Sequence, residues 1–273
     1  MIKSMFAFKR KPPYRIGLAL SGGGARGFAH AGALKALLEV GLKPDIVAGV
    51  SAGSVAAVLY TSGMEPEGIV DLFRQQSFTQ LCELTTPTSG LMRMEGFCQL
   101  LRDNIPYKNL EDLPIPTVVG ATDFDRGKPV AFTTGDIVTA VSASCSMPIV
   151  FKPVEINGTR YVDGGVLHNL PAWTIRKLCR VLIGINCSPL TSGPSSKNNL
   201  LGVALRSYEL MAKTNCANDL MMCDIAVHTD AIARYQVFNL KDIDKVYRSG
   251  YIETMRTLLS LGFRPRKRTV SLQ

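Results

Sequence analysis

What this 273-residue sequence lacks limits its function before any motif is considered. It has no run of 18 uncharged apolar residues, so it offers no candidate transmembrane helix. The apolar stretch within residues 1–11 is too short for a signal peptide. The seven cysteines are odd in number and show no paired spacing, which fits reduced thiols better than a disulfide framework. These absences predict a soluble, cytoplasmic protein.

Patterns that bind metals or cofactors are also missing. The chain has no D-x-D-x-D-G calcium loop, and the pair Asp123 and Asp125 is typical of a turn. Cys216, Cys223 and His228 lie near one another in the sequence, but their spacing matches no common zinc site. We therefore expect neither a metal nor another cofactor.

The composition that is present suits a globular α/β protein. With 46% hydrophobic residues, the chain is long enough to bury a substantial core. Helical patterns separate several strand-like runs, which predicts a three-layer α/β/α sandwich around a central, mostly parallel sheet. We expect a single domain over residues 1–273, with a core at about 14–190 and residues 200–273 completing or capping it after the loop Ser188–Asn199. The strand-like runs are Ile16–Leu20, Ile46–Val50, Thr117–Ala121, Val130–Thr133, Arg160–Val162, Val181–Asn186 and Ile225–Thr229.

One of these runs leads directly into a G-x-S-x-G pattern. Gly49 and Gly53 flank Ser51, and the residues that follow are small and compatible with a helix. A serine on a tight strand-to-helix turn needs neighbours without bulky side chains, and its hydroxyl then stays exposed as a nucleophile. The positive end of the helix dipole at the same place favours negative charge on an attacked substrate. The pattern alone also fits an ordinary glycine-rich turn.

A second glycine-rich turn lies upstream. The strand-like run Ile16–Leu20 is followed by Gly22, Gly23 and Gly24, then by Arg26 and a helical pattern from Phe28 to Val40. Uncovered N–H groups in such a loop can hold a phosphate or the oxyanion of a tetrahedral intermediate. Since only about 30 residues separate the two turns, we expect their strands to be parallel neighbours, with both loops at the carboxyl edge of the sheet.

The same glycines also satisfy the dinucleotide fingerprint G-x-G-x-x-G, from Gly22 to Gly27. A dinucleotide site needs an acidic residue at the end of the second strand to hold the ribose. That strand ends in Ser51, and Asp45 precedes it at the opposite edge of the sheet. A nucleotide-binding α/β protein therefore remains only as an alternative.

A nucleophilic serine needs a base, and the chain has only three histidines. His30 lies among small residues of the first helix, His168 lies in a turn, and His228 lies within the strand-like run Ile225–Thr229. Only His228 has the Ser, acid, His order of a hydrolase triad, which leaves a Ser-His-Asp esterase acting on small esters as an alternative. Asp163 is the better candidate, because it ends a strand-like run directly before two glycines and its carboxylate should project from a sharp turn.

Taken together, these motifs resemble those of the patatin-like phospholipases. Gly22–Gly27 resembles the oxyanion loop of that family, Gly49–Gly53 its nucleophile elbow and Asp163–Gly165 its D-G-G/A base motif, in the same order. The run Ser142–Pro148 is also similar, and the likeness extends over about residues 14–190. Three ordered motifs are far more specific than any one of them.

The resemblance implies a lipid acyl hydrolase of the phospholipase A or lysophospholipase type that works without a metal. Ser51 and Asp163 would form a catalytic dyad, and Gly22, Gly23 and Gly24 would bind the oxyanion together with Arg26. Its partner would be a phospholipid or another acyl-ester lipid. A silent lipid-binding protein is the remaining alternative. The glycines that shape the two turns would be Gly49, Gly53, Gly164 and Gly165.

The formal net charge of +9 gathers partly at the two ends of the chain. Basic ends bind anionic lipid or nucleic acid, or simply stay solvated. For a lipid hydrolase the membrane interpretation gains weight, so we expect no nucleic acid and keep peripheral membrane contact as a hypothesis. The residues concerned are Phe6, Phe8, Lys9, Arg10, Lys11, Arg264, Arg266, Lys267 and Arg268.

Overall fold

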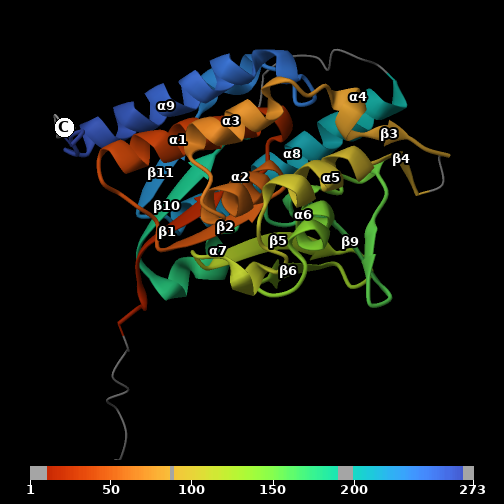
Figure 1. Ribbon diagram of the computed structural model, residues 1–273, viewed down its shortest axis with the longest axis horizontal. Coiled ribbons are helices and arrows are strands. Elements are labelled where there is room, and N and C mark those ends of the chain that lie inside the picture. Colours follow the sequence, from red (N-terminus) through yellow and green to blue (C-terminus); the bar gives the residue numbers. More distant parts are fainter. Residues whose placement is uncertain (1–10, 87–88, 190–198, 267–273) are drawn as a thin grey trace, which may run out of the picture.

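The strand-like runs predicted from the sequence form one sheet (Figure 1). The computed structural model describes residues 11–86, 89–189 and 199–266. The sheet follows the order β11-β10-β1-β2-β5-β9-β8, and β6 also pairs with β5. Its strands are β1 (Tyr14–Leu20), β2 (Ile46–Val50), β5 (Thr117–Asp123), β6 (Lys128–Phe132), β8 (Val154–Ile156), β9 (Thr159–Asp163), β10 (Cys179–Asn186) and β11 (Ile225–His228).

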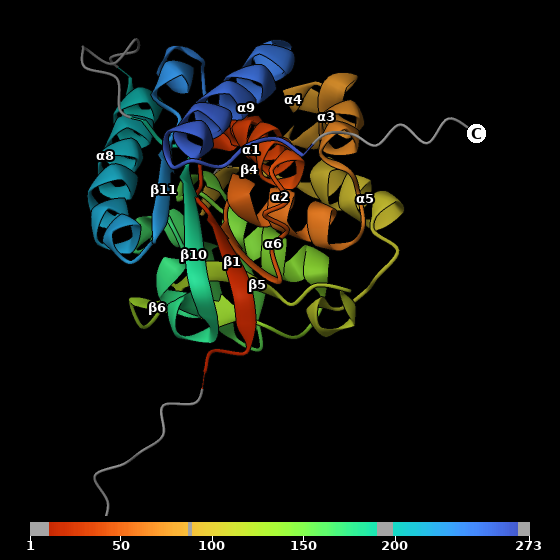
Figure 2. The same cartoon turned by 90° about the vertical axis from the view of Figure 1, so that its left-hand side faces the viewer.

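Helices cover both faces of this sheet, which confirms the three-layer α/β/α architecture (Figure 2). Successive residues of a strand point to opposite faces. Accordingly, Leu18 and Leu20 are buried in one hydrophobic core and Ala19 in the other. One layer contains α1 (Phe28–Glu39), α2 (Ala52–Thr61), α6 (Ile137–Cys145) and α9 (Ile243–Ser260), and the other contains α7 (Ala172–Ile175) and α8 (Leu200–Met221).

The central strands β11, β10, β1, β2 and β5 are parallel. In the pairing of β1 with β2, Leu20 lies opposite Gly49, so the two glycine-rich turns leave the sheet side by side. This confirms the predicted neighbourhood of the turns at the carboxyl edge. β9 and β8 are antiparallel to their neighbours, and Asp163 of β9 pairs with Ala121 of β5. The end of β9 thereby reaches the same edge.

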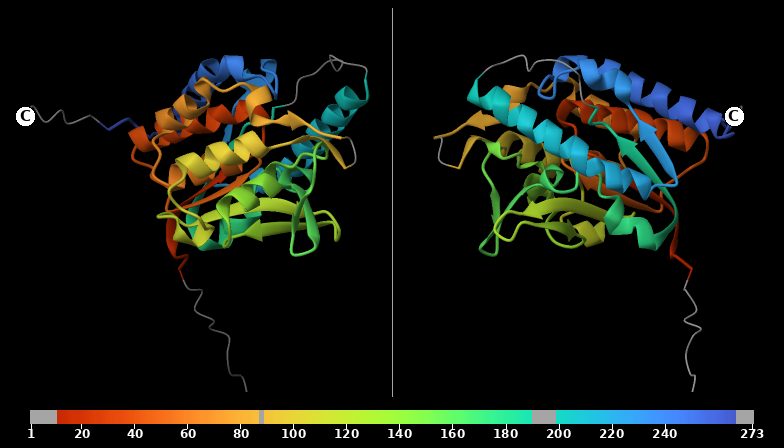
Figure 3. Two further views of the ribbon diagram at one scale, coloured as in Figure 1. Left: turned by 45° about the vertical axis from the view of Figure 1, so that its right-hand side comes forward. Right: turned by 180° about the vertical axis from the view of Figure 1, so that it is seen from behind.

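A small second sheet stands beside this edge and was not predicted. It has the order β3-β4-β7 and projects from one end of the molecule (Figure 3, left). Its strands contain only two to four residues, too few for a recognisable alternation of apolar and polar side chains. The strands of this sheet are β3 (Glu83–Leu84), β4 (Gly90–Arg93) and β7 (Ile149–Phe151). In the chain, the helices α3 (Pro66–Arg74) and α4 (Phe78–Leu81) precede β3, and α5 (Glu95–Asn104) follows β4.

The two long C-terminal helices pack on opposite faces of the main sheet. α9 lies along α1 so closely that a Cβ at Gly32 or Gly250 would collide with the backbone of the facing helix. α8 crosses the other face (Figure 3, right). Among the described residues, no helix combines the length and apolar character needed to cross a membrane. The sequence predictions for residues 190–198 and for Phe6, Phe8, Lys9, Arg10, Lys267 and Arg268 lie outside the described ranges.

Candidate active site

Ser51 occupies a strained turn between β2 and α2. Its φ of 52° and ψ of −126° are unusual for a residue with a side chain. The backbone N–H of Ser51 donates to Ser144 Oγ (2.8 Å), and the Ser144 hydroxyl donates to the Gly120 carbonyl (2.6 Å). A Cβ at Gly49 would collide with Gly53. The turn therefore has the tight geometry expected of a nucleophile elbow, held in place by Ser144.

Asp163 ends β9 inside the protein and is fully buried. Its Oδ1 accepts a hydrogen bond from the Gly165 N–H (2.8 Å). Among the described residues, no hydrogen bond of regular geometry reaches Oδ2, but the hydroxyls of Ser51 and Tyr208 interact with the carboxylate. Burial raises the pKa of Asp163 to about 6, although the bonds from Ser51, Gly165 and Tyr208 oppose the rise. Ser51 thus lies beside a carboxylate that is a stronger base than usual.

The glycine loop offers fewer free donors than the sequence predicts. The Gly22 N–H already donates a hydrogen bond to the Asn169 carbonyl (3.0 Å), so it is not available to an oxyanion. The N–H groups of Gly23 and Gly24 donate to no other described residue, and neither does that of Ala52 at the start of α2. Gly24 has a φ of 56°, which glycine adopts without strain. Two loop donors rather than three remain beside Ser51.

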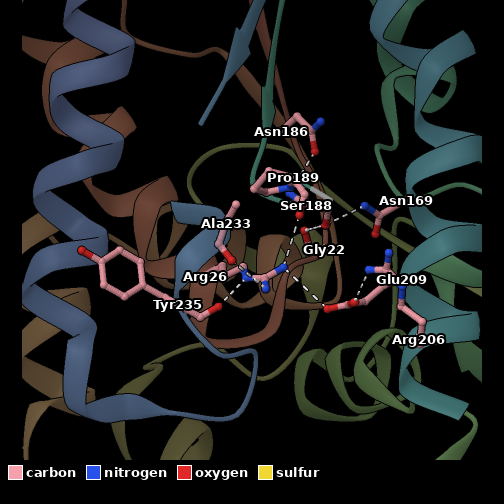
Figure 4. Close-up of polar contacts among 10 residues, drawn as sticks. All are labelled: Gly22, Arg26, Asn169, Asn186, Ser188, Pro189, Arg206, Glu209, Ala233 and Tyr235. Carbon is pink, nitrogen blue, oxygen red and sulfur yellow. Dashed lines mark hydrogen bonds and ion pairs between the residues drawn. The ribbon is translucent and has the colours of Figure 1, made fainter. Parts of the chain in front are cut away.

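Arg26 extends from this loop into a network of carbonyl groups (Figure 4). Its Nε donates to the Tyr235 carbonyl (2.8 Å) and its Nη2 to the Ala233 carbonyl (3.2 Å). Nη1 lies 3.4 Å from the Pro189 carbonyl and 3.6 Å from Glu209 Oε1. Burial lowers the pKa of Arg26, and the charge of Glu209 opposes that shift. These contacts favour a role in fixing the loop to the 233–235 segment over direct contact with an oxyanion.

None of the three histidines faces Ser51. His30 is buried, with Nε2 2.7 Å from the Ser21 carbonyl, and burial lowers its pKa to about 4. His168 Nδ1 lies 2.7 Å from Asp219 Oδ2, and His228 ends β11 with an exposed side chain. Neither of the two cavities beside Ser51 has a described histidine in its lining. The geometry thus gives no support to the Ser-His-Asp alternative.

The nucleotide alternative also lacks the residue that it needs. Asp45 precedes β2, and its Oδ2 accepts hydrogen bonds from the N–H groups of Arg15 and Ile16 (2.9 Å each). Those contacts place it at the amino end of β1, opposite the edge that carries Ser51. An acid at that edge cannot hold the ribose of a nucleotide bound at the glycine loop.

Two cavities of different character meet at Ser51. The larger, about 150 Å³, is almost entirely apolar and extends between α1, α2, α3, α4 and α5. The smaller, about 50 Å³, is more polar and lies toward α8. Residues lining the larger include Phe28, Val55, Ile69, Phe73, Phe78, Phe97, Met147 and Phe238, and residues lining the smaller include Gly23, Arg26, Ser188, Tyr208 and Glu209. Such a site can hold an apolar chain on one side of the serine and a polar group on the other.

Sequence reasoning missed three residues that shape this site. Ser144 lies within the run Ser142–Pro148, whose likeness to the family does not by itself indicate a role. Asn169 follows the D-G-G motif by four residues, and its carbonyl accepts from the Gly22 N–H, so it joins the glycine loop to the segment that follows Asp163. Tyr208 comes from α8 and carries no motif of its own. Only the first two had any signal in the sequence.

Comparison with known proteins agrees with this geometry. The family model described as patatin-like phospholipase matches residues 18–175, more than half of the chain. An uncharacterized NTE family protein of Mycobacterium tuberculosis is 34% identical over 189 residues, which cover 66% of this chain and 51% of the relative. The neuropathy target esterase sws of Drosophila melanogaster is 34% identical over 171 residues, which cover 60% of this chain and 12% of that protein. The matches thus span about half the length of the mycobacterial relative and far less of the fly protein.

Among solved structures, VipD from Legionella pneumophila has a similar fold. The alignment covers 91% of this chain and 67% of VipD, with a TM-score of 0.50 and 16% sequence identity. At that identity the likeness concerns the fold alone.

Proposed function

This chain belongs to the patatin-like phospholipase family, and from that premise we propose that it hydrolyses acyl esters of lipids through a Ser51–Asp163 dyad. One observation carries the proposal. A serine in a strained elbow lies beside a buried carboxylate whose pKa is raised to about 6, at the junction of an apolar and a polar cavity. Each feature serves acyl transfer, and no described histidine competes for the role of base.

In the proposed acylation step, the Ser51 hydroxyl attacks the ester carbonyl while Asp163 accepts its proton. Oδ2 is the carboxylate oxygen suited to this task, because Oδ1 is held by the Gly165 N–H. A carboxylate with a pKa of about 4 is a weak base at neutral pH, and desolvation brings its pKa closer to the working range. Burial of Asp163 therefore makes the carboxylate a better base and lowers the free energy of unfolding of the protein.

The negative charge on the carbonyl oxygen would be stabilised by backbone donors. The N–H groups of Gly23 and Gly24 have no acceptor among the described residues and can serve this purpose. The N–H of Ala52 lies at the start of α2, where the helix dipole also favours negative charge. Gly22 and Arg26 would act indirectly, since their own donors hold the loop in place. Deacylation would follow by the reverse sequence, with a water molecule deprotonated by Asp163 attacking the acyl-serine.

The two cavities suggest how a lipid would be oriented. We assign the acyl chain to the apolar cavity between α1 and α5, because its lining is almost entirely aromatic and aliphatic. The alcohol portion would then lie in the smaller cavity beside Arg26 and Glu209. We propose a phospholipid or lysophospholipid as acyl donor, with peripheral contact between the protein and the lipid surface.

The test compares Ser51→Ala and Asp163→Asn with the matched control Ser62→Ala. Within the described part of the chain, the Ser62 hydroxyl donates to the Leu59 carbonyl alone, at the end of α2. Release of fatty acid from phosphatidylcholine and lysophosphatidylcholine is measured for each folded variant. We expect the first two variants to lose at least about 10²-fold in kcat/KM, and the control to retain wild-type activity. A well-folded Asp163→Asn variant with full activity would overturn the dyad.

A further inference from the structure

Tyr208 links the candidate base to the cavity assigned to the alcohol. Its hydroxyl interacts with the Asp163 carboxylate and lies so close to Gly165 that a Cβ there would collide with it. The same side chain lines the smaller cavity together with Ser51. One hydroxyl is therefore in reach of both the base and the space beside the nucleophile.

The position of this hydroxyl is set by contacts that do not involve it. Further along α8, Asn215 Nδ2 donates to the Gly165 carbonyl (2.8 Å) and Asn215 Oδ1 accepts from the Asn169 N–H (2.8 Å). One turn later, Asp219 Oδ2 lies 2.7 Å from His168 Nδ1. These residues fasten one face of α8 to the turn that follows Asp163. Removing the Tyr208 hydroxyl leaves this attachment intact.

The hydroxyl also keeps its proton at neutral pH. Burial raises the pKa of Tyr208 well above its usual value, and the charge of Asp163 raises it further. A neutral phenol beside a carboxylate can donate its own proton and accept the one that the carboxylate has taken. Since no described residue forms a hydrogen bond of regular geometry with Asp163 Oδ2, this oxygen can exchange that proton.

We propose that Tyr208 is a catalytic proton relay that protonates the departing alkoxide, an inference that rests on the proposed Ser51–Asp163 dyad. The Ser51 proton first moves to Asp163 as Oγ bonds to the carbonyl carbon. When the tetrahedral intermediate collapses, the bond from carbon to the leaving oxygen breaks. Tyr208 gives its proton to that oxygen and takes the proton held by Asp163. The alcohol leaves neutral, Ser51 is acylated, and both Asp163 and Tyr208 regain their starting states.

The test uses Tyr208→Phe with two esters that share one acyl chain and differ in leaving group. A p-nitrophenolate leaves without protonation, whereas the alkoxide of a glyceryl ester requires a proton. We expect kcat/KM, which reports acylation, to fall about 10²-fold or more for the glyceryl ester and less than about threefold for the p-nitrophenyl ester. Tyr251→Phe is the matched control, because it removes a tyrosine hydrogen bond to Glu39 on the α9 side of the molecule.

Equal losses for both esters would show a merely structural role, and no loss for either would exclude the relay. Both outcomes leave the dyad intact, whereas an active Ser51→Ala variant would remove the dyad itself. A second measurement needs no variant. Across a series of alkyl and aryl esters, the wild-type kcat/KM should depend only weakly on the pKa of the leaving alcohol, and a steep dependence would contradict the relay.

Discussion

The raised pKa of Asp163 predicts a distinctive loss of activity in mild acid. The base works only when ionised, so kcat/KM should rise with pH through the pKa of the free enzyme. With a pKa of about 6, roughly a tenth of the molecules carry an ionised Asp163 at pH 5, and roughly nine tenths do at pH 7. An aspartate with an ordinary pKa of about 3.9 would already be more than about nine tenths ionised at pH 5.

The assay is hydrolysis of a soluble p-nitrophenyl ester between pH 4.5 and 8.5, with kcat/KM determined at each pH. We expect the value at pH 5 to be about a tenth of the plateau value. Enzyme held at pH 5 and returned to pH 8 should recover fully, which separates titration from unfolding. If kcat/KM at pH 5 lies within twofold of the plateau, the buried carboxylate is not the group that limits the reaction.

Three further predictions concern stability, the base and the oxyanion. The folded-state pKa of Asp163 lies about two units above its unfolded value, so ionised Asp163 destabilises the fold by roughly 3 kcal/mol above pH 6 and not below pH 4. The free energy of unfolding of Asp163→Asn should therefore rise relative to that of the wild type as the pH is raised from 4 to 8. A difference between the two that does not depend on pH would contradict this. His228→Gln should keep substantial esterase activity, and a loss of about 10³-fold in a folded variant would restore the triad. Gly24→Ala should lower kcat by about 10²–10³-fold. The control is Gly63→Ala, because Gly63 also has a positive φ but open space around it, and this variant should change stability alone. Equal kcat values in the two variants would argue against an oxyanion role for Gly24.

Much of the fold could be predicted because the central strands are buried on both faces. Runs such as Ile46–Val50 are apolar throughout, and the turns after them are marked by glycine. Parallel pairing then requires that Ser51 and the glycine loop meet at one edge. The short strands β3 and β4 escaped prediction, since two and four residues are too few to show a local pattern of apolar and polar side chains.

The parts of the site that the sequence did not reveal depend on long-range contacts. Gly22 looks like any other loop donor until the fold brings the Asn169 carbonyl to its N–H. Arg26 is close to the oxyanion loop in sequence, yet its partners lie more than 160 residues away. Tyr208 reaches Asp163 only because α8 crosses the sheet, and no spacing rule connects the two positions.

Covalent trapping of the nucleophile tests most directly whether Ser51 is the catalytic serine. The protein is incubated with a serine-reactive fluorophosphonate at pH 8, digested, and mapped by mass spectrometry. We expect a single phosphonylated residue, Ser51, with labelling strongly reduced in Asp163→Asn and unchanged in Ser62→Ala. Labelling of a different serine, or none in active wild-type enzyme, would contradict this expectation.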